Sequence, residues 1–291
     1  MRFIHSIFLL FVGSEALRPL VVWHGINDDC AGFTSSLIAK IKTRAPDLYV
    51  HCIQIGDTPK IDYRNSLFML GQKQLEIACA RVNADENLKN GFNAFGISQG
   101  GLFLRALIQT CPPSEVHNFV TFSAPHQGIF GIPNCFKSVP AFLCRFISKS
   151  LTHAAYTPQV QKLFTPIQYW HDPLREEAYR QKSQFAAIYN NERNFNATFK
   201  QNLLKVKNFV LARNTEDEVI VPRESSHFAY YREGQGREIV NFTSTRVFKE
   251  DLIGLKELYD SGRLTFLEVP GRHMQSPYGW LEGITSDYFV N

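Results

Sequence analysis

Apolar runs alternate with amphipathic stretches along the first half of the chain. The run at residues 19–23 predicts a buried strand, and apolar side chains recur at helical spacing from Phe33 to Ile41. Ala45-Pro46-Asp47 is expected to end that helix, because proline cannot continue it. Later segments continue the alternation, with strands expected at 48–55, 92–97 and 119–122 and helices at 67–82 and 101–108. This order is typical of an α/β fold with a mainly parallel central sheet.

The stretch from about Pro125 to Lys207 interrupts this alternation. It has several prolines, many aromatic residues and no clear strand, and two apolar runs follow it at 208–212 and 264–269. We therefore expect a mostly helical insertion, at about 125–207, between two strands of the sheet. Such an insertion can cap a site and bind a long apolar ligand, or it can be a helical subdomain with its own core. No Gly/Ser linker separates it, so residues 17–291 are expected to form a single domain.

Composition narrows the possible classes of protein. Of the 291 residues, 44% are hydrophobic and 20% are charged, which is enough apolar material to bury a sizeable core. The formal charge of +4 comes from 31 Lys and Arg against 27 Asp and Glu, without a basic block, so a nucleic-acid partner is not expected. No uninterrupted apolar stretch reaches the roughly 18 residues of a spanning helix, so no transmembrane anchor is expected either.

The N-terminus has the pattern of a secretory signal peptide. Arg2 precedes an apolar block that runs to Val12, and the small residues Ser14 and Ala16 occupy the positions that a signal peptidase reads. Cleavage is expected after Ala16, which makes residues 1–16 the signal peptide. The alternative interpretation is that this block forms the first strand or helix of the domain.

Cysteines and sequons agree with an oxidising, secretory route. The six cysteines are an even number without a C-x-x-C pair, which favours disulfides over thiol redox chemistry or zinc binding. Two N-x-[ST] sequons make Asn196 and Asn241 candidate glycosylation sites.

The strongest chemical signal is Gly96-x-Ser98-x-Gly100, which lies between a predicted strand and a predicted helix. In that context the motif predicts a nucleophile elbow, a sharp turn that exposes the serine hydroxyl above the sheet. The backbone N–H of Gln99, at the start of the helix, is then a candidate oxyanion donor. The alternative is a glycine-rich turn with an unreactive serine.

A reactive serine requires a base, and in this architecture the chain order is Ser, acid, His. That order leaves His227 and His273. His273 is favoured because it follows the predicted strand at 264–269 and a Pro270-Gly271 turn, whereas His227 lies in a polar stretch with no strand directly before it. The expected reaction requires no metal or organic cofactor.

Three adjacent acids, Glu216, Asp217 and Glu218, follow the predicted strand at 208–212. Asp217 is favoured, because Asp is the usual third member of a serine–histidine–acid triad and because its distance from the following Val-Pro is common on this loop. Its role would be to hold the base in the correct tautomer. The second oxyanion donor is expected at the end of the first strand, from the backbone N–H of Ile26. We expect His24 and His126 to have structural rather than catalytic roles, with His126 shaping the site through hydrogen bonds.

Several segments together resemble the palmitoyl-protein thioesterase family, in its order and spacing. Those segments are Pro19 to Gly25, Gly96 to Gly101, His126-Gln127-Gly128, Tyr169-Trp170-His171-Asp172-Pro173 and Gly271-Arg272-His273. The resemblance implies a lysosomal α/β-hydrolase that removes long-chain acyl groups from cysteine thioesters. It also implies that Ser98, Asp217 and His273 form the triad, that Ile26 and Gln99 form the oxyanion hole, and that the insertion binds the acyl chain.

The resemblance further implies the disulfides Cys79–Cys111 and Cys135–Cys144. The sequence departs from the family at Asp29-Cys30-Ala31, where the main branch has two adjacent cysteines, and Cys52 is an additional cysteine. We therefore regard a Cys30–Cys52 bridge as a hypothesis. Asn27 stands where the family usually has glycine.

The expected partners are S-acylated proteins or peptides and long-chain acyl-CoA, acted on by a monomer in the lysosome or after secretion. The triad motifs leave two other activities open, a shorter-chain acyl-CoA thioesterase and an ester lipase of the same fold. An inactive acyl-lipid binding protein is a third, more distant reading.

Overall fold

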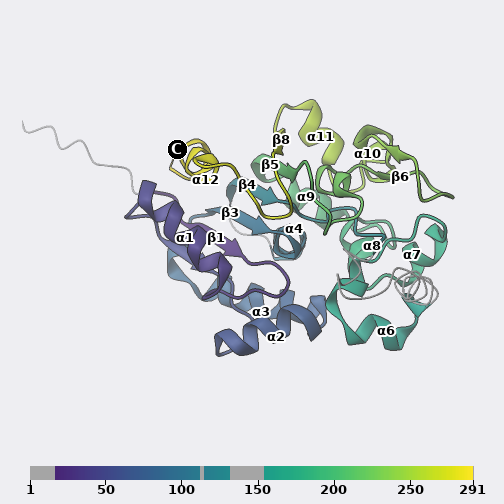
Figure 1. Ribbon diagram of the computed structural model, residues 1–291, viewed down its shortest axis with the longest axis horizontal. Helices are drawn as coiled ribbons and strands as arrows, with labels where there is room; N and C mark the ends of the chain where they lie inside the picture. The colour runs from purple at the N-terminus through teal and green to yellow at the C-terminus, as the bar shows by residue number, and fades with distance from the viewer. Residues whose placement is uncertain (1–16, 112–114, 132–153, 291) are drawn as a thin grey trace, which may run out of the picture.

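The computed structural model describes residues 17–111, 115–131 and 154–290. A six-stranded sheet crosses its centre in the order β2-β1-β3-β4-β5-β8, with every neighbouring pair parallel (Figure 1). The strands are β1 (Leu20–Trp23), β2 (Val50–Cys52), β3 (Phe92–Ile97), β4 (Val116–Phe122), β5 (Val206–Asn214) and β8 (Leu264–Val269). The prediction of an α/β fold with a mainly parallel sheet is confirmed. The expected signal peptide at 1–16 and the Cys135–Cys144 bridge lie outside the described residues.

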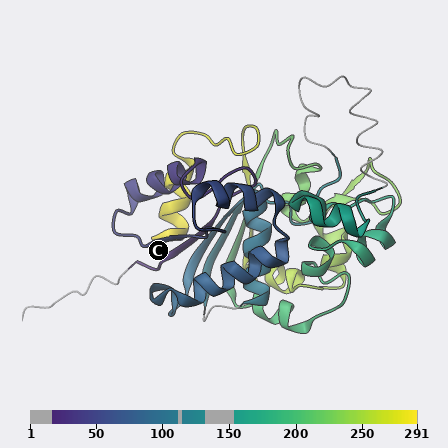
Figure 2. The ribbon, with the colours of Figure 1, turned by 90° about the horizontal axis from the view of Figure 1, so that it is seen from below.

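Helices cover both faces of this sheet, which explains why the central strands β1 and β3 are buried along their whole length. Successive residues of β1 point to opposite faces, so that Val21 and Trp23 enter one hydrophobic cluster while Leu20 and Val22 enter the other. The helices on the first face include α3 (Gly71–Ala84) and α4 (Gln99–Thr110), and those on the second are α1 (Phe33–Arg44) and α12 (Trp280–Ile284) (Figure 2).

Between β4 and β5 the described chain forms a series of short helices, as expected of the insertion. They are α6 (Pro158–Leu163), η2 (Thr165–Tyr169), α7 (Glu176–Lys182), α8 (Ala186–Tyr189) and α9 (Ala197–Leu203). Their buried aromatic residues belong to the same hydrophobic cluster as one face of the sheet, and Phe185 stacks on Phe103 of α4 with ring centroids 4.1 Å apart. The insertion and the sheet therefore share one core.

The prediction was wrong between β2 and β3. Helix α2 (Pro59–Phe68) lies where no element was expected, and the helix predicted at 67–82 begins only at Gly71. The reason is physical: the residues that α2 buries are Asp62 and Ser66, so the segment has no apolar periodicity. The predicted strand at 48–55 is also shorter, from Val50 to Cys52.

Several short elements had no counterpart in the sequence prediction, because two to six residues are too few to establish a period. They are η1 (Glu86–Leu88), η3 (Arg223–His227), β6 (Tyr230–Tyr231), β7 (Ile239–Val240), η4 (Phe242–Ser244), α10 (Arg246–Lys249), α11 (Leu255–Asp260) and η5 (Thr285–Phe289). Within the described ranges, none of the helices has the length and apolar character needed to cross a membrane.

Candidate active site

Ser98 occupies a strained turn between β3 and α4. Its φ of +51° and ψ of −124° lie in a region that side-chain-bearing residues rarely adopt. The flanking glycines permit this turn, because a Cβ on Gly96 would lie 2.4 Å from Gly101 Cα and one on Gly100 would lie 2.2 Å from the Trp23 carbonyl oxygen. The Gly-x-Ser-x-Gly motif is therefore an elbow that holds Ser98 where the strand becomes a helix.

The structure brings the three predicted triad residues together at the carboxyl ends of β3, β5 and β8. His273 Nε2 lies 3.0 Å from Ser98 Oγ, and His273 Nδ1 lies 2.7 Å from Asp217 Oδ2. The Asp217 carboxylate is fully buried, and its Oδ1 accepts the N–H groups of Val219 at 2.9 Å and Ile220 at 3.0 Å. The carboxylate is thus held in place while its other oxygen faces the histidine.

The competing residues have other partners. Glu216 is exposed, and a Glu218 oxygen lies 3.7 Å from a guanidinium nitrogen of Arg272. His227 is buried, and its Nε2 donates to the carbonyl oxygens of Leu211 and Leu267. Burial, assisted by the charge of Arg213, lowers the pKa of His227 to about 4. In the part of the chain that the structure describes, Glu216, Glu218 and His227 form no side-chain hydrogen bond or ion pair with Ser98 or His273.

His126 lies in the core below the insertion. Its ring stacks on Phe228 with centroids 4.6 Å apart, and its nitrogens contact Arg105 Nε at 3.3 Å and Thr121 Oγ1 at 3.1 Å. Burial and the charge of Arg105 hold the pKa of His126 well below its usual range. This neutral histidine contacts the buried Arg105 side chain. His126 can therefore influence the active site only indirectly, through the packing of Arg105.

The two predicted oxyanion donors belong to segments that adjoin Ser98. Gln99 is the first residue of α4, and a Cβ on Gly25 would lie 3.2 Å from Ser98 Cβ, which shows how closely the loop after β1 approaches the serine. Asn27, next to Ile26 in this loop, has a φ of +56°. Asparagine tolerates this left-handed conformation better than most residues, which explains how it can stand where a glycine was expected.

Sequence reasoning missed Asn214, which ends β5. This residue is fully buried; its Oδ1 accepts the hydroxyl of Ser123 at 2.9 Å, and its Nδ2 donates to the carbonyl oxygen of Gln275 at 2.6 Å. Asn214 thereby joins the end of β4 to the loop of His273. The signal available in the sequence was a polar residue shortly after the apolar run at 208–212.

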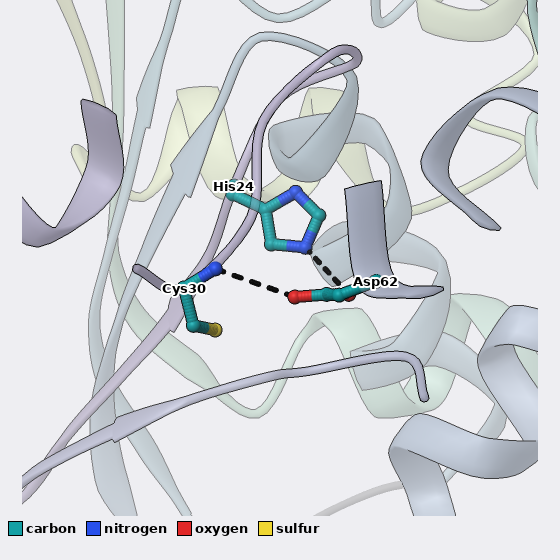
Figure 3. Close-up of side chains that lie close together, drawn as sticks. All are labelled: His24, Cys30 and Asp62. Atoms are coloured by element: carbon teal, nitrogen blue, oxygen red, sulfur yellow. Dashed lines mark hydrogen bonds and ion pairs between the residues drawn. The ribbon is translucent and has the colours of Figure 1, made fainter. Parts of the chain in front are cut away.

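His24, Cys30 and Asp62 also cluster beside the elbow, with potential ligand atoms within 4.8 Å of one another (Figure 3). The set does not fit a metal, because the Cys30 sulfur forms a disulfide with Cys52 and His24 Nε2 hydrogen-bonds to Asp62 Oδ1 at 3.1 Å. The structure therefore contains the Cys30–Cys52 bridge that the sequence raised as a hypothesis.

The structure also contains the Cys79–Cys111 bridge, which joins α3 to the end of α4. Both sequon asparagines are exposed: Asn196 caps α9, and Asn241 precedes η4. An exposed amide is what glycosylation requires.

A cavity of about 740 Å³ lies between the insertion and the segment from β6 to α10. Acidic and basic side chains dominate its lining, among them Glu176, Arg180, Glu192, Arg246 and Glu250. Such a lining is unsuited to an acyl chain, because each apolar group placed there would displace water from charged groups. An acyl chain therefore requires a different surface.

Comparison with known proteins identifies similar chains. The family described as palmitoyl protein thioesterase matches residues 19–273. Palmitoyl-protein thioesterase 1 of Caenorhabditis elegans is 39% identical over 275 residues, which cover 94% of this chain and 92% of the relative. Palmitoyl-protein thioesterase 3 of Dictyostelium discoideum is 34% identical over 296 residues, which cover 100% and 97%.

Two further matches are more distant. Lysosomal thioesterase PPT2-B of Xenopus laevis is 31% identical over 267 residues, which cover 89% of this chain and 86% of the relative. Among solved structures, the monoacylglycerol lipase of Paleococcus ferrophilus matches with a TM-score of 0.46 and 16% identity, covering 92% of each chain.

Proposed function

Because this chain belongs to the palmitoyl-protein thioesterase family, we propose that it hydrolyses long-chain acyl thioesters of cysteine residues, with Ser98 as the nucleophile. The observation that carries this proposal is the continuous set of contacts from Ser98 Oγ through His273 to the Asp217 carboxylate. A serine hydroxyl is a poor nucleophile unless a base of this kind removes its proton.

In the proposed reaction, His273 Nε2 takes the Ser98 proton as Oγ attacks the thioester carbonyl carbon. The tetrahedral intermediate then collapses, the C–S bond breaks, and the thiol leaves with the proton from His273. Water, deprotonated by the same nitrogen, then attacks the carbonyl carbon of the Ser98 ester. The bond between this carbon and Oγ breaks, the fatty acid is released, and His273 returns the proton to Ser98 Oγ. Asp217 keeps the proton of His273 on Nδ1 and stabilises the imidazolium that forms in each half-reaction.

The negative oxygen of each intermediate is assigned to the backbone N–H groups of Ile26 and Gln99. Two features support this assignment: Gln99 begins α4, where N–H groups have no intrahelical acceptor, and the Gly25-Ile26 loop packs beside Ser98. The reaction requires no metal or organic cofactor.

For the acyl chain, the proposed binding surface lies where α2 meets the insertion. Phe68 and Leu163 are exposed, and the rings of Phe68 and Phe164 are 5.9 Å apart between centroids. Tyr169 of the same insertion segment donates a hydrogen bond to the Gln99 side chain at 3.0 Å, which links this surface to the elbow. Each methylene buried there would contribute about 0.8 kcal/mol, which favours long chains.

The proposed substrates are S-acylated proteins or peptides together with long-chain acyl-CoA, and the proposed acting species is a monomer. The proposed location is the secretory pathway, with the lysosome or the exterior as the destination. Disulfides such as Cys79–Cys111 and the exposed sequon at Asn196 support that route.

The test is hydrolysis of palmitoyl-CoA and butyryl-CoA by the mature protein beside Ser98→Ala. We expect rapid cleavage of palmitoyl-CoA, slow cleavage of butyryl-CoA and loss of both in the variant. Preference for the short chain would retain the triad and favour a shorter-chain thioesterase. Undiminished activity of Ser98→Ala would exclude Ser98 as the nucleophile, and failure of a fluorophosphonate probe to label the wild type would favour an inactive binding protein.

A further inference from the structure

Helix α2 buries polar side chains where a helix packed on a sheet ordinarily buries apolar ones. Of its ten residues, the buried ones are Asp62 and Ser66, at 0% and 1% exposure, whereas its apolar Ile61 and Phe68 are exposed. Residues four apart lie on one face of a helix, so Asp62 and Ser66 point in the same direction. Burial of apolar surface therefore contributes little to holding α2 in place. The hydrogen bonds of these two polar residues are the contacts that position the helix.

Asp62 holds the loop after β1 at two points (Figure 3). Its Oδ1 accepts a hydrogen bond from His24 Nε2 at 3.1 Å, and its Oδ2 accepts one from the backbone N–H of Cys30 at 3.3 Å. These two points lie on either side of Ile26, the proposed oxyanion donor. Fixing both ends of such a short loop restricts the positions that the Ile26 N–H can adopt.

The His24–Asp62 contact is a buried ion pair. His24 Nδ1 faces the carbonyl oxygen of Gly25 at 2.9 Å and Nε2 faces the carboxylate, so both nitrogens carry protons. Burial lowers the pKa of His24, but the hydrogen bond and charge of Asp62 outweigh burial and raise the pKa above 6.5. Removing the carboxylate would leave a buried cation without its partner, which is strongly unfavourable.

Ser66 contacts both oxyanion segments. Its Oγ accepts the backbone N–H of Asn27, directly after Ile26, at 3.1 Å. Its carbonyl oxygen accepts the side-chain amide of Gln99, the other proposed donor residue, at 2.9 Å. One turn of α2 thus touches the loop after β1 and the first residue of α4 at the same time.

We propose that Asp62 and Ser66 are positioning residues that set the spacing between the two oxyanion donors, the N–H groups of Ile26 and Gln99. This inference rests on the proposed function, because it assumes that those groups stabilise the intermediate formed on Ser98. In this proposal α2, a helix without a catalytic side chain, determines the geometry of the oxyanion hole.

The consequence is a selective loss of transition-state binding. Asp62→Asn removes the charge and one acceptor, and Ser66→Ala removes the acceptor for Asn27. Both are expected to lower kcat for palmitoyl-CoA by roughly 10- to 100-fold, because displacing a donor by a fraction of an ångström forfeits part of the 10²- to 10³-fold that one donor contributes. KM is expected to change less than about twofold, since neither residue belongs to the proposed acyl surface.

The experiment compares two inhibitors of the folded enzymes. A long-chain trifluoromethyl ketone forms a hemiketal oxyanion on Ser98, whereas a thioether analogue of palmitoyl-CoA binds without forming one. For each variant we expect the Ki of the ketone to rise by the same factor as kcat/KM falls, while the Ki of the thioether stays constant. Asp85→Asn is the matched control, because it neutralises another histidine–aspartate pair, with His51 at 2.7 Å, and the Asp85 carboxylate bonds to Tyr49, His51 and Asn87 rather than to residues 24–30.

Equal weakening of both inhibitors, or unchanged kcat in both variants, would overturn the proposal and leave a purely structural role. Thermal unfolding of each variant identifies gross misfolding, and Ser66→Ala decides the question where Asp62→Asn does not fold. Failure of the proposed function is distinguishable, since it shows as a wild type inactive on palmitoyl-CoA. In that case the same comparison is made with p-nitrophenyl butyrate, a short ester that requires only the elbow.

Discussion

The Asn214 side-chain oxygen lies 2.9 Å from the backbone nitrogen of Met274, the residue directly after His273. Met274 has a φ of +63°, a conformation that a side-chain-bearing residue adopts only when its surroundings impose it. With the bond from Asn214 Nδ2 to Gln275, the loop is clamped on the side that follows the proposed base. Asn214 therefore holds the backbone that follows His273, while its own side chain bonds to Ser123, Met274 and Gln275 rather than to the imidazole.

Replacing Asn214 by alanine is expected to lower kcat for palmitoyl-CoA by roughly 10- to 100-fold with little change in KM, because the base loses its orientation. Stability should fall by about 1–3 kcal/mol, since buried partners lose their hydrogen bonds. Steady-state kinetics and urea unfolding measure both effects. Asn208→Ala, at the opposite end of β5, removes a hydrogen bond to Asn118 and should alter stability alone; equal kcat losses in the two variants would contradict the clamp.

The carboxylate partner of the base can be assigned by a second pair of variants. Asp217→Asn presents an amide N–H to His273 Nδ1 and stabilises the wrong tautomer, so kcat should fall by roughly 10³- to 10⁴-fold. Glu218→Gln, one residue away, removes a charge that pairs with Arg272 and should change kcat less than about twofold. Both are measured as single-turnover acylation rates, and the reverse order of effects would transfer the role to Glu218.

Local signals made the elbow and its partners predictable from the sequence. The strand before Ser98, apolar apart from Asn93, the glycines around the serine and the strand before His273 are each visible within a few residues. Asn214 and α2 were not predictable in the same way. Their roles depend on hydrogen bonds to residues distant in sequence, and a helix that buries Asp62 and Ser66 looks, as a sequence, like a polar loop.

The choice of the acid could not be settled from the sequence, because the acid and the base lie far apart in the chain. Three adjacent acids competed for one role, and the local signals, residue type and the spacing to Val-Pro, favour Asp217 without excluding its neighbours. Only the fold shows that Asp217 is buried with its Oδ1 held by two backbone N–H groups, while Glu216 points to solvent. Burial is the observation that supports the proposal of Asp217, and burial is a property of the tertiary structure.

A charged pair in the insertion predicts how stability varies with pH. The His171 ring is stacked between Tyr179 and Tyr230, with centroids 3.6 and 4.2 Å away. Its Nδ1 lies 2.6 Å from the carbonyl oxygen of Gln127 and its Nε2 lies 2.9 Å from Glu176 Oε1, so both nitrogens face acceptors. This arrangement favours the imidazolium form.

Burial lowers the pKa of His171, but Glu176 outweighs burial and the pKa lies above 6.5. Burial likewise raises the pKa of Glu176, but His171 outweighs it and the pKa lies below 4.5. The stabilisation is therefore fully present between about pH 4.5 and 6.5. It is lost as pH rises through the raised pKa of His171, and as pH falls through the lowered pKa of Glu176.

Glu176→Gln should consequently destabilise the protein most near pH 5.5, by about 3 kcal/mol, and less at pH 8.5. Urea unfolding of wild type and variant at both pH values measures the difference. Glu177→Gln is the control, because Glu177 is exposed and its side chain contacts Arg180 and Gln181 of its own helix. A destabilisation that is constant from pH 5.5 to 8.5 would exclude the charged pair.

Variants of the proposed acyl surface are expected to change the enzyme's preference for acyl chain length. Phe68 and Leu163 are 54% and 66% exposed, and replacing Phe68 with asparagine and Leu163 with glutamine removes apolar area that only a long chain can cover. We expect kcat/KM for palmitoyl-CoA to fall roughly 10-fold or more, because a few methylenes lose about 0.8 kcal/mol each, while butyryl-CoA hydrolysis changes less than about twofold. Phe195→Asn, at an equally exposed position between α8 and α9, should leave the ratio unchanged. A parallel fall for both substrates would place the acyl chain elsewhere, since damage to the elbow affects every acyl length alike.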